Sequence, residues 1–118
     1  MNAMFAESKF NKDLSHWDVS KVNDMQYMFY NSVFNKDISG WNVSNVRNMK
    51  AMFSMSKFNK DISDWDVSNV NDMSYMFQGS EFTQDISDWY ILNNLHYYDY
   101  MFKDCPIEEK NKPLILQE

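Results

Sequence analysis

The chain has 118 residues and a formal net charge of −6, and its length fits a single domain. The acidic excess disfavours nucleic-acid binding, which uses Lys and Arg to replace counterions, and it also disfavours binding to an anionic membrane surface. No run of about 18 apolar residues is present, so we expect no membrane span. The single cysteine, Cys105, allows no internal disulfide, and the first residues do not read as a signal peptide, so the sequence leaves the localisation open.

A sequence of 20 residues occurs three times with few changes and a fourth time in altered form. The copies read FNKDLSHWDVSKVNDMQYMF, FNKDISGWNVSNVRNMKAMF, FNKDISDWDVSNVNDMSYMF and FTQDISDWYILNNLHYYDYMF. They begin every 24 residues, and a fixed period of this size indicates a solenoid, a propeller or an array. One short strand-like segment per copy is too few for a propeller. We therefore expect one repeat array at 1–105, with a partial repeat at 1–9, repeats at 10–33, 34–57, 58–81 and 82–105, and a C-terminal cap or tail at 106–118.

The first half of each copy favours a short strand followed by a bend. In the second copy, Ile38 stands between two polar residues, and Trp41 and Val43 follow at alternate positions. The chain has only two Gly and two Pro, so its turns must be made by Asn, Asp and Ser. One polar position per copy is expected to form a ladder that satisfies backbone groups of the adjoining coil. Its members are Asn11, Asn35, Asn59 and Thr83.

The second half of each copy favours a helix of about ten residues. In the second copy, apolar residues recur at i, i+3, i+6 and i+7, which is one face of a helix. They are Val46, Met49, Met52 and Phe53. Ser44 lies two residues before them and suits the N-cap. In the fourth copy an inserted residue gives this place to Asn93, ahead of Leu95.

These elements predict an α/β repeat solenoid. We expect a leucine-rich-repeat-like coil of about four 24-residue repeats, each with one short strand and one short helix, and with the strands stacked as a parallel sheet.

The repeat F-N-x-D-[IL]-S-x-W-[DN]-V-S-x-V-x-x-M-x-x-M-F resembles the bacterial surface protein repeat, a relative of the BspA-like leucine-rich repeats, over about residues 1–105. The closing stretch from Cys105 to Pro113 is similar to the end of many such arrays. The resemblance implies a non-enzymatic, right-handed solenoid that takes part in adhesion or protein contacts. It implies a cell-surface or extracellular protein, with the virion or cytoplasm as alternatives, because related repeats also occur in viral and phage-encoded proteins.

The two ends of the array differ. Met1, Met4 and Phe5 match the Met-x-x-Met-Phe of the next unit, so the chain opens inside a unit and should expose its core there. Either the array continues in a longer chain or this end docks on a neighbour. The other end is rich in charged residues and carries Pro106 and Pro113, which stop regular structure, so we expect it to be closed.

One acidic position is present in every copy, at Asp13, Asp37, Asp61 and Asp85. Stacked coils would bring these carboxylates into a row, where they repel one another unless compensated. Each Asp could accept backbone N–H groups in its own turn or pair with a neighbouring Lys. A weaker alternative is a calcium site, since Ca²⁺ prefers oxygen ligands.

No catalytic centre or cofactor site is predicted. His16 and His96 have no partners at metal-ligand spacing, and no Gly-rich phosphate loop occurs. The run from Ser15 to Asp18 holds the residue types of a hydrolase triad, but consecutive residues of an extended segment point alternately and do not converge.

Exposed positions that vary between copies are the candidates for recognition of a protein partner: Tyr27, Tyr30, Asp64, Tyr75 and Asp88. Tyr offers a large contact area with a polar tip, although these tyrosines could instead merely cover the helix layer. The leading hypothesis is therefore a protein-interaction module. The alternative is a structural building block, part of a surface layer or a virion, that self-associates through its N-terminal coil.

Overall fold

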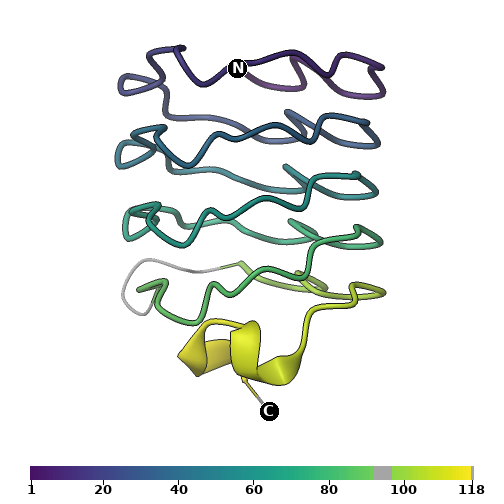
Figure 1. The fold of residues 1–118 in the computed structure, drawn as a ribbon. Coiled ribbons are helices and arrows are strands. Elements are labelled where there is room, and N and C mark those ends of the chain that lie inside the picture. Colours follow the sequence, from purple (N-terminus) through teal and green to yellow (C-terminus); the bar gives the residue numbers. More distant parts are fainter. Residues whose placement is uncertain (92–96, 118) are drawn as a thin grey trace.

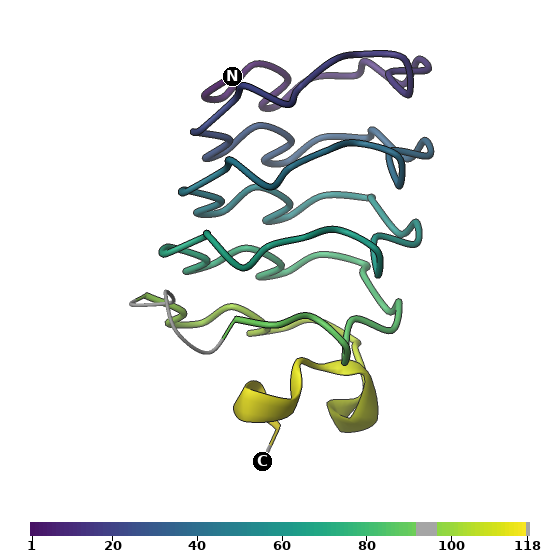
Figure 2. The same cartoon turned by 90° about the vertical axis from the view of Figure 1, so that its left-hand side faces the viewer.

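The chain is wound into coils that stack one upon another, with the two termini at opposite ends of the stack (Figures 1 and 2). This arrangement is seen in a computed structural model, which describes residues 1–91 and 97–117. Each coil is bonded to the next through residues about one repeat apart in the sequence. For example, the N–H of Tyr27 donates to the carbonyl of Lys50 over 2.9 Å, and that of Ala51 donates to Ser74 over 2.9 Å.

The predicted α/β class with a stacked parallel sheet is wrong. The only helices in the described part of the chain are two short 3-10 helices near the C-terminus, η1 (Glu109–Asn111) and η2 (Leu114–Leu116). Parallel β-bridges do join consecutive coils, at Asp24–Asn48, Asn48–Asp72 and Asp72–Tyr97, but each is isolated. Several backbone hydrogen bonds join each coil to the next, but turns interrupt the backbone between them, so no sheet forms among these residues.

Successive turns replace the helix that was predicted in the second half of each copy. In the second copy the N–H of Met52 closes a turn on the carbonyl of Met49, and that of Ser54 closes one on Ala51. The intervening N–H groups of Ala51 and Phe53 donate instead to the next coil. An α-helix would use all of these donors within its own coil and leave none for the neighbour. The predicted capping residue Asn93 and Leu95 lie outside the described residues.

Two positions in each of these turn segments have left-handed backbone. The first is held by Ala3, Tyr27, Ala51, Tyr75 and Tyr100, with φ between 54° and 60°. The second, four residues later, is held by Glu7, Asn31, Met55, Gly79 and Asp104, with φ between 51° and 64°. Positive φ at the third residue of a turn is the requirement of a type II turn, and it interrupts any α-helix.

The predicted strands are also replaced by turns. The carboxylate of Asp37 accepts the N–H of Ser39 over 2.8 Å, and the N–H of Trp41 closes a turn on Ile38. Side chains of this kind compete with a strand because they offer the backbone a local partner. Ser44 likewise does not cap a helix, since its N–H and its hydroxyl both donate to the side chain of Asn42.

The predicted polar ladder is confirmed. The side-chain oxygen of each Asn accepts the backbone N–H of the equivalent residue one coil further on, over 2.9 Å at every step. The steps run from Asn11 to Asn35, Asn59 and Thr83.

Aromatic side chains stack along the core. Phe29, Phe53 and Phe77 follow one another with ring centroids 5.6 Å and then 5.7 Å apart. Trp41, Trp65 and Trp89 form a parallel row with centroids 6.5 Å apart, and each indole N–H donates to a buried carbonyl of the preceding coil. The rows bury large rings at favourable separations and satisfy their polar atoms, so they stabilise a stack whose described residues form no long helix or strand.

The two ends of the stack are covered to different degrees. Met4 is 53 % exposed and Trp17 is 37 % exposed, whereas their equivalents in the next coil, Met28 and Trp41, are buried. The expected exposure of core residues at the N-terminal end is confirmed. At the other end, η1 bonds to the last coil, because the N–H of Ile86 donates to the carbonyl of Asn111. This end is covered, though it is not purely polar, because Leu114 of η2 is 73 % exposed.

Candidate functional site

The stacked turn segments form one side of the molecule, here called the turn face and defined as residues 25–31, 49–55, 73–79 and 98–104. Hydrogen bonds between the coils hold the first left-handed residue of each segment beside those of the neighbouring coils. Side chains at one turn position therefore form a row that crosses the coils. In that row Tyr27 is followed by Ala51, and then by Tyr75 and Tyr100.

Tyrosine side chains cluster at both ends of this row. Tyr27 meets Tyr30 of its own coil edge-on, with ring centroids 5.7 Å apart. Tyr75 meets Tyr100 of the next coil at 5.5 Å, and the ammonium group of Lys103 lies 5.0 Å from the centre of the Tyr100 ring. The turn face therefore carries two aromatic clusters separated by the coil that contains Ala51.

A hollow of about 380 Å³ lies between the two clusters. Ala51, which is only 2 % exposed, is one of its lining residues. The others are Tyr27, Tyr30, Lys50, Ser54, Tyr75 and Gln78. The sequence analysis named the three tyrosines as contact residues, and the structure brings all three to this one hollow.

Lys50 supplies the positive charge of the hollow. Its backbone N–H is bonded to the side chain of Asn48 over 2.9 Å. No acidic side chain within residues 1–91 and 97–117 forms an ion pair with its ammonium group, whereas Lys57, Lys110 and Lys112 are all paired. The hollow thus joins aromatic rings and polar side chains to a cation with no ion-pair partner among the described residues, an arrangement that suits an aromatic group carried next to an anion.

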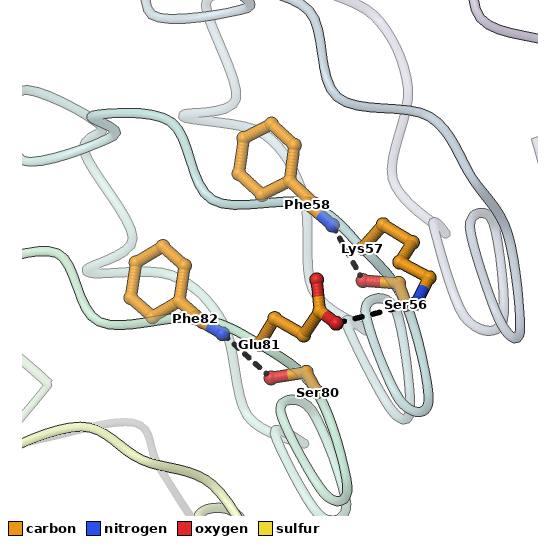
Figure 3. A network of polar contacts seen from close by, with 6 residues as sticks. All are labelled: Ser56, Lys57, Phe58, Ser80, Glu81 and Phe82. Carbon is orange, nitrogen blue, oxygen red and sulfur yellow. Dashed lines mark hydrogen bonds and ion pairs between the residues drawn. The ribbon is translucent and has the colours of Figure 1, made fainter.

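The corner that follows the turn face is held by side chains from the spacers (Figure 3). The hydroxyls of Ser56 and Ser80 each accept the backbone N–H of the phenylalanine two residues later, at 3.3 Å in both coils. Lys57 and Glu81 form an ion pair of 3.2 Å between these coils. Because both charged groups are well exposed, the pair contributes little stability. The serine bonds fix where the chain leaves the turn face.

The other predicted contact residues lie elsewhere. Asp64 and Asp88 are exposed, and neither lines the hollow on the turn face. Asp88 borders a different hollow of about 490 Å³, beside Tyr90 and the exposed Leu114 and Ile115. The five residues named from the sequence therefore do not form one site.

The repeated aspartates act as local backbone acceptors. Asp13, Asp37, Asp61 and Asp85 each accept the backbone N–H of the serine two residues later, at 2.8 or 2.9 Å. Hydrogen bonds from Ser15 hold the pKa of Asp13 below its ordinary value, and those from Ser87 do the same for Asp85. The local bonding predicted for this row is confirmed. Within the described residues no group of three or more His, Cys, Asp or Glu is placed to hold a metal ion.

The contact residues predicted from the sequence did not include the other members of the hollow, which are Lys50, Ala51, Ser54 and Gln78. The residue ahead of each Met-Phe pair is a signal for Ala51, because Tyr holds this place at 27, 75 and 100 and Ala holds it at 3 and 51. Ala51 therefore marks an inner coil that lacks the tyrosine of its two neighbours.

Core residues at the predicted assembly end are incompletely covered. Met1 and Phe5 pack partly against the core and Met4 is exposed. The predicted lack of a membrane span agrees with the structure, in which the described residues form no helix long and apolar enough to cross a bilayer.

Comparison with known proteins identifies a family for the chain. No curated protein and no solved structure is detectably similar to the chain. A protein-family model matches residues 1–114, nearly the whole sequence. The chain therefore belongs to the family described as Mycoplasma protein of unknown function, DUF285.

Proposed function

We propose that the protein is a non-enzymatic interaction module whose turn face binds a protein partner. The observation that carries this proposal is the hollow around Ala51, where three tyrosines meet a lysine that forms no ion pair with any described residue, on an otherwise regular stack. Tyrosine is enriched in protein interfaces because a rigid ring and a polar tip give contact area at low entropic cost. The resemblance of the repeat to those of bacterial surface proteins supports the same class of function.

The stack suits this role because its shape does not depend on the residues that would make contact. The core rows and the polar ladder hold each coil, while the turn-face positions differ from one coil to the next. A surface of this kind can be altered residue by residue without loss of the fold, as in other repeat proteins.

Photocrosslinking in cells that produce the protein tests this proposal. A benzophenone amino acid replaces Gln78 at the rim of the hollow, and a matched variant carries it at the exposed Asp64. We expect a discrete crosslinked protein from position 78 and none from position 64. Crosslinking from position 64 alone, or from neither position, would contradict the assignment to the turn face.

A second candidate function is self-assembly through the N-terminal coil. It is favoured by the exposed Met4 and Trp17, whose equivalents in the next coil are buried. If this coil is an assembly surface, light scattering should give a mass above that of the monomer, and Met4→Lys with Phe5→Ser should restore the monomer. A monomer at every concentration would rule the candidate out for the chain in solution.

A further inference from the structure

We propose that the hollow over Ala51 is a slot for one aromatic side chain of the partner, presented on a segment that also carries a carboxylate. This inference rests on the proposed binding function and specifies the ligand chemistry of the same face. It follows from the spacing of the tyrosine row, from the backbone at Ala51 and from the charge at the rim.

The spacing of the row matches the separation of paired aromatic rings. Rings that occupy one position in adjacent coils lie 5.5 Å apart for Tyr75 and Tyr100, and 5.6 Å apart for Phe29 and Phe53. Tyr27 and Tyr75 are two coils apart and line the same hollow, with Ala51 between them. Because Ala51 is itself only 2 % exposed, an added ring would lie outside its methyl group in the outer part of the hollow, where aromatic pairs with the lining tyrosines favour centroid separations of 4.5–7 Å.

The backbone does not require alanine at this position. Ala51 has φ of 54°, and the same left-handed conformation is held by Tyr27, Tyr75 and Tyr100 at 57° to 60°. A tyrosine at position 51 would be no more strained than its neighbours and would continue the row. The hollow is therefore a property of this one side chain and is not imposed by the coil.

The positive charge of Lys50 indicates which charged group should lie next to the incoming aromatic residue. Lys50 precedes Ala51 and lines the hollow, and no acid in the described part of the chain neutralises it. At the far end of the row Lys103 already lies against Tyr100, which shows that a cation can remain beside these rings. A carboxylate near the incoming aromatic residue would pair with Lys50, so the slot fits an acidic segment with one aromatic residue.

Ala51→Tyr is the decisive variant, because it fills the slot with a residue that the same turn position already accepts in three other coils. Ala3→Tyr is the matched control. It makes the same substitution at the same turn position, with φ of 54°, in a coil that does not line the hollow. Both variants are compared with the unaltered chain for their midpoint of urea unfolding, which shows whether either has lost its fold.

The probes are short blocked peptides, titrated into the isotope-labelled full chain while the backbone amide signals are followed by NMR. The first is acetyl-Gly-Asp-Tyr-Gly-amide. Two control peptides differ from it by one residue: one has Leu in place of Tyr, and the other has Asn in place of Asp. We expect the Tyr peptide to shift the amide signals of Ala51 and Tyr75 at millimolar concentration. The Leu peptide should bind about tenfold more weakly and the Asn peptide about threefold more weakly at low salt.

The slot is supported if Ala51→Tyr abolishes the shifts at Tyr75 and Ala3→Tyr leaves them unchanged. It is overturned if the Leu peptide binds as well as the Tyr peptide, if Ala51→Tyr binds like the unaltered chain, or if no peptide shifts these signals at about 10 mM, where contacts of this size should be visible. If crosslinking from position 78 persists in the Ala51→Tyr chain, the turn face still binds its partner and only the slot is rejected. If position 78 gives no crosslink in the unaltered chain, the proposed function itself fails.

Discussion

The indole N–H of Trp65 donates to the carbonyl oxygen of Ile38 over 3.0 Å, across 27 residues of sequence and from one coil to the preceding one. The same bond joins Trp41 to Leu14 and Trp89 to Ile62. These contacts are buried, so each one both joins two coils and satisfies a carbonyl that water does not reach. Stability of the stack should therefore depend on the indole nitrogen as well as on the size of the ring.

Trp65→Phe should lower the free energy of unfolding by about 2–3 kcal/mol, because it leaves the Ile38 carbonyl unpaired and removes buried ring area. Urea unfolding followed by circular dichroism measures the loss. Trp17→Phe is the control, since Trp17 is partly exposed at the first coil, and it should cost less than about 1 kcal/mol. Equal losses for the two variants would show that the hydrogen bond contributes nothing.

Asn59→Ala should destabilise the protein by about 1 kcal/mol, because the N–H of Thr83 loses the acceptor that it meets at 2.9 Å. Amide hydrogen exchange should quicken most at Thr83. Asn59→Asp keeps an oxygen at the same place and should preserve most of the protection. If exchange at Thr83 is the same in all three proteins, the ladder is not a stabilising element.

Met55→Gly should raise stability by up to about 1 kcal/mol, because Met55 is exposed and holds a φ of 59° that disfavours residues with a side chain. The next coil already has Gly79 at this place, with a φ of 64°. Gly79→Ala should have the opposite effect, since its new Cβ would run into the Met55 sulfur in addition to the backbone strain. Thermal unfolding of the two variants checks the prediction, and a loss of stability in Met55→Gly would contradict it.

Stability should fall in acid. Hydrogen bonds from Ser68 hold the pKa of Asp66 in the folded protein below its ordinary value of 3.8, so the folded state binds the proton more weakly than the unfolded state. The contribution of Asp66 is therefore complete above the unfolded pKa and is lost as the pH falls through 3.8 toward the folded pKa. Asp18 and Asp37 are shifted in the same direction by bonds from Ser20 and Ser39.

Asp66→Asn tests this dependence with a substitution that the repeat itself contains. Asn42 occupies the equivalent place and accepts the N–H of Ser44 at 3.1 Å, the distance between Asp66 and Ser68. The variant should keep the turn but lose less stability than the unaltered protein between pH 6 and pH 3, as measured by urea unfolding. An identical loss in both proteins would exclude Asp66 as a source of the acid sensitivity.

The sequence predicted which residues are buried better than it predicted the backbone that buries them. Val46, Met49, Met52 and Phe53 were expected to face the core, and all four are buried. The helix was wrong because a series of four-residue β-turns, each closed between residues i and i+3, buries side chains at nearly the same intervals. Left-handed φ is usually marked by Gly, and here Tyr, Ala and Met hold it, so the composition gave no warning.

Only the tyrosines of the candidate site could be predicted from the repeat. Tyr27 and Tyr75 recur at the repeat period, so any stacking of the copies brings them to one side of the molecule. Ala51 and Lys50 could be recognised only once the coils were in place, because their importance lies in what surrounds them. Asp64 and Asp88 stand at a position that also varies between copies, but neither lines this hollow.

The most direct test of binding at the turn face is the yield of crosslinked partner from position 78 in three proteins: the unaltered chain, Ala51→Tyr and Ala3→Tyr. We predict equal yields from the unaltered chain and Ala3→Tyr, and at least a tenfold lower yield from Ala51→Tyr at unchanged folding stability. If position 78 captures no partner in any of the three, the turn face is not the binding surface of this protein.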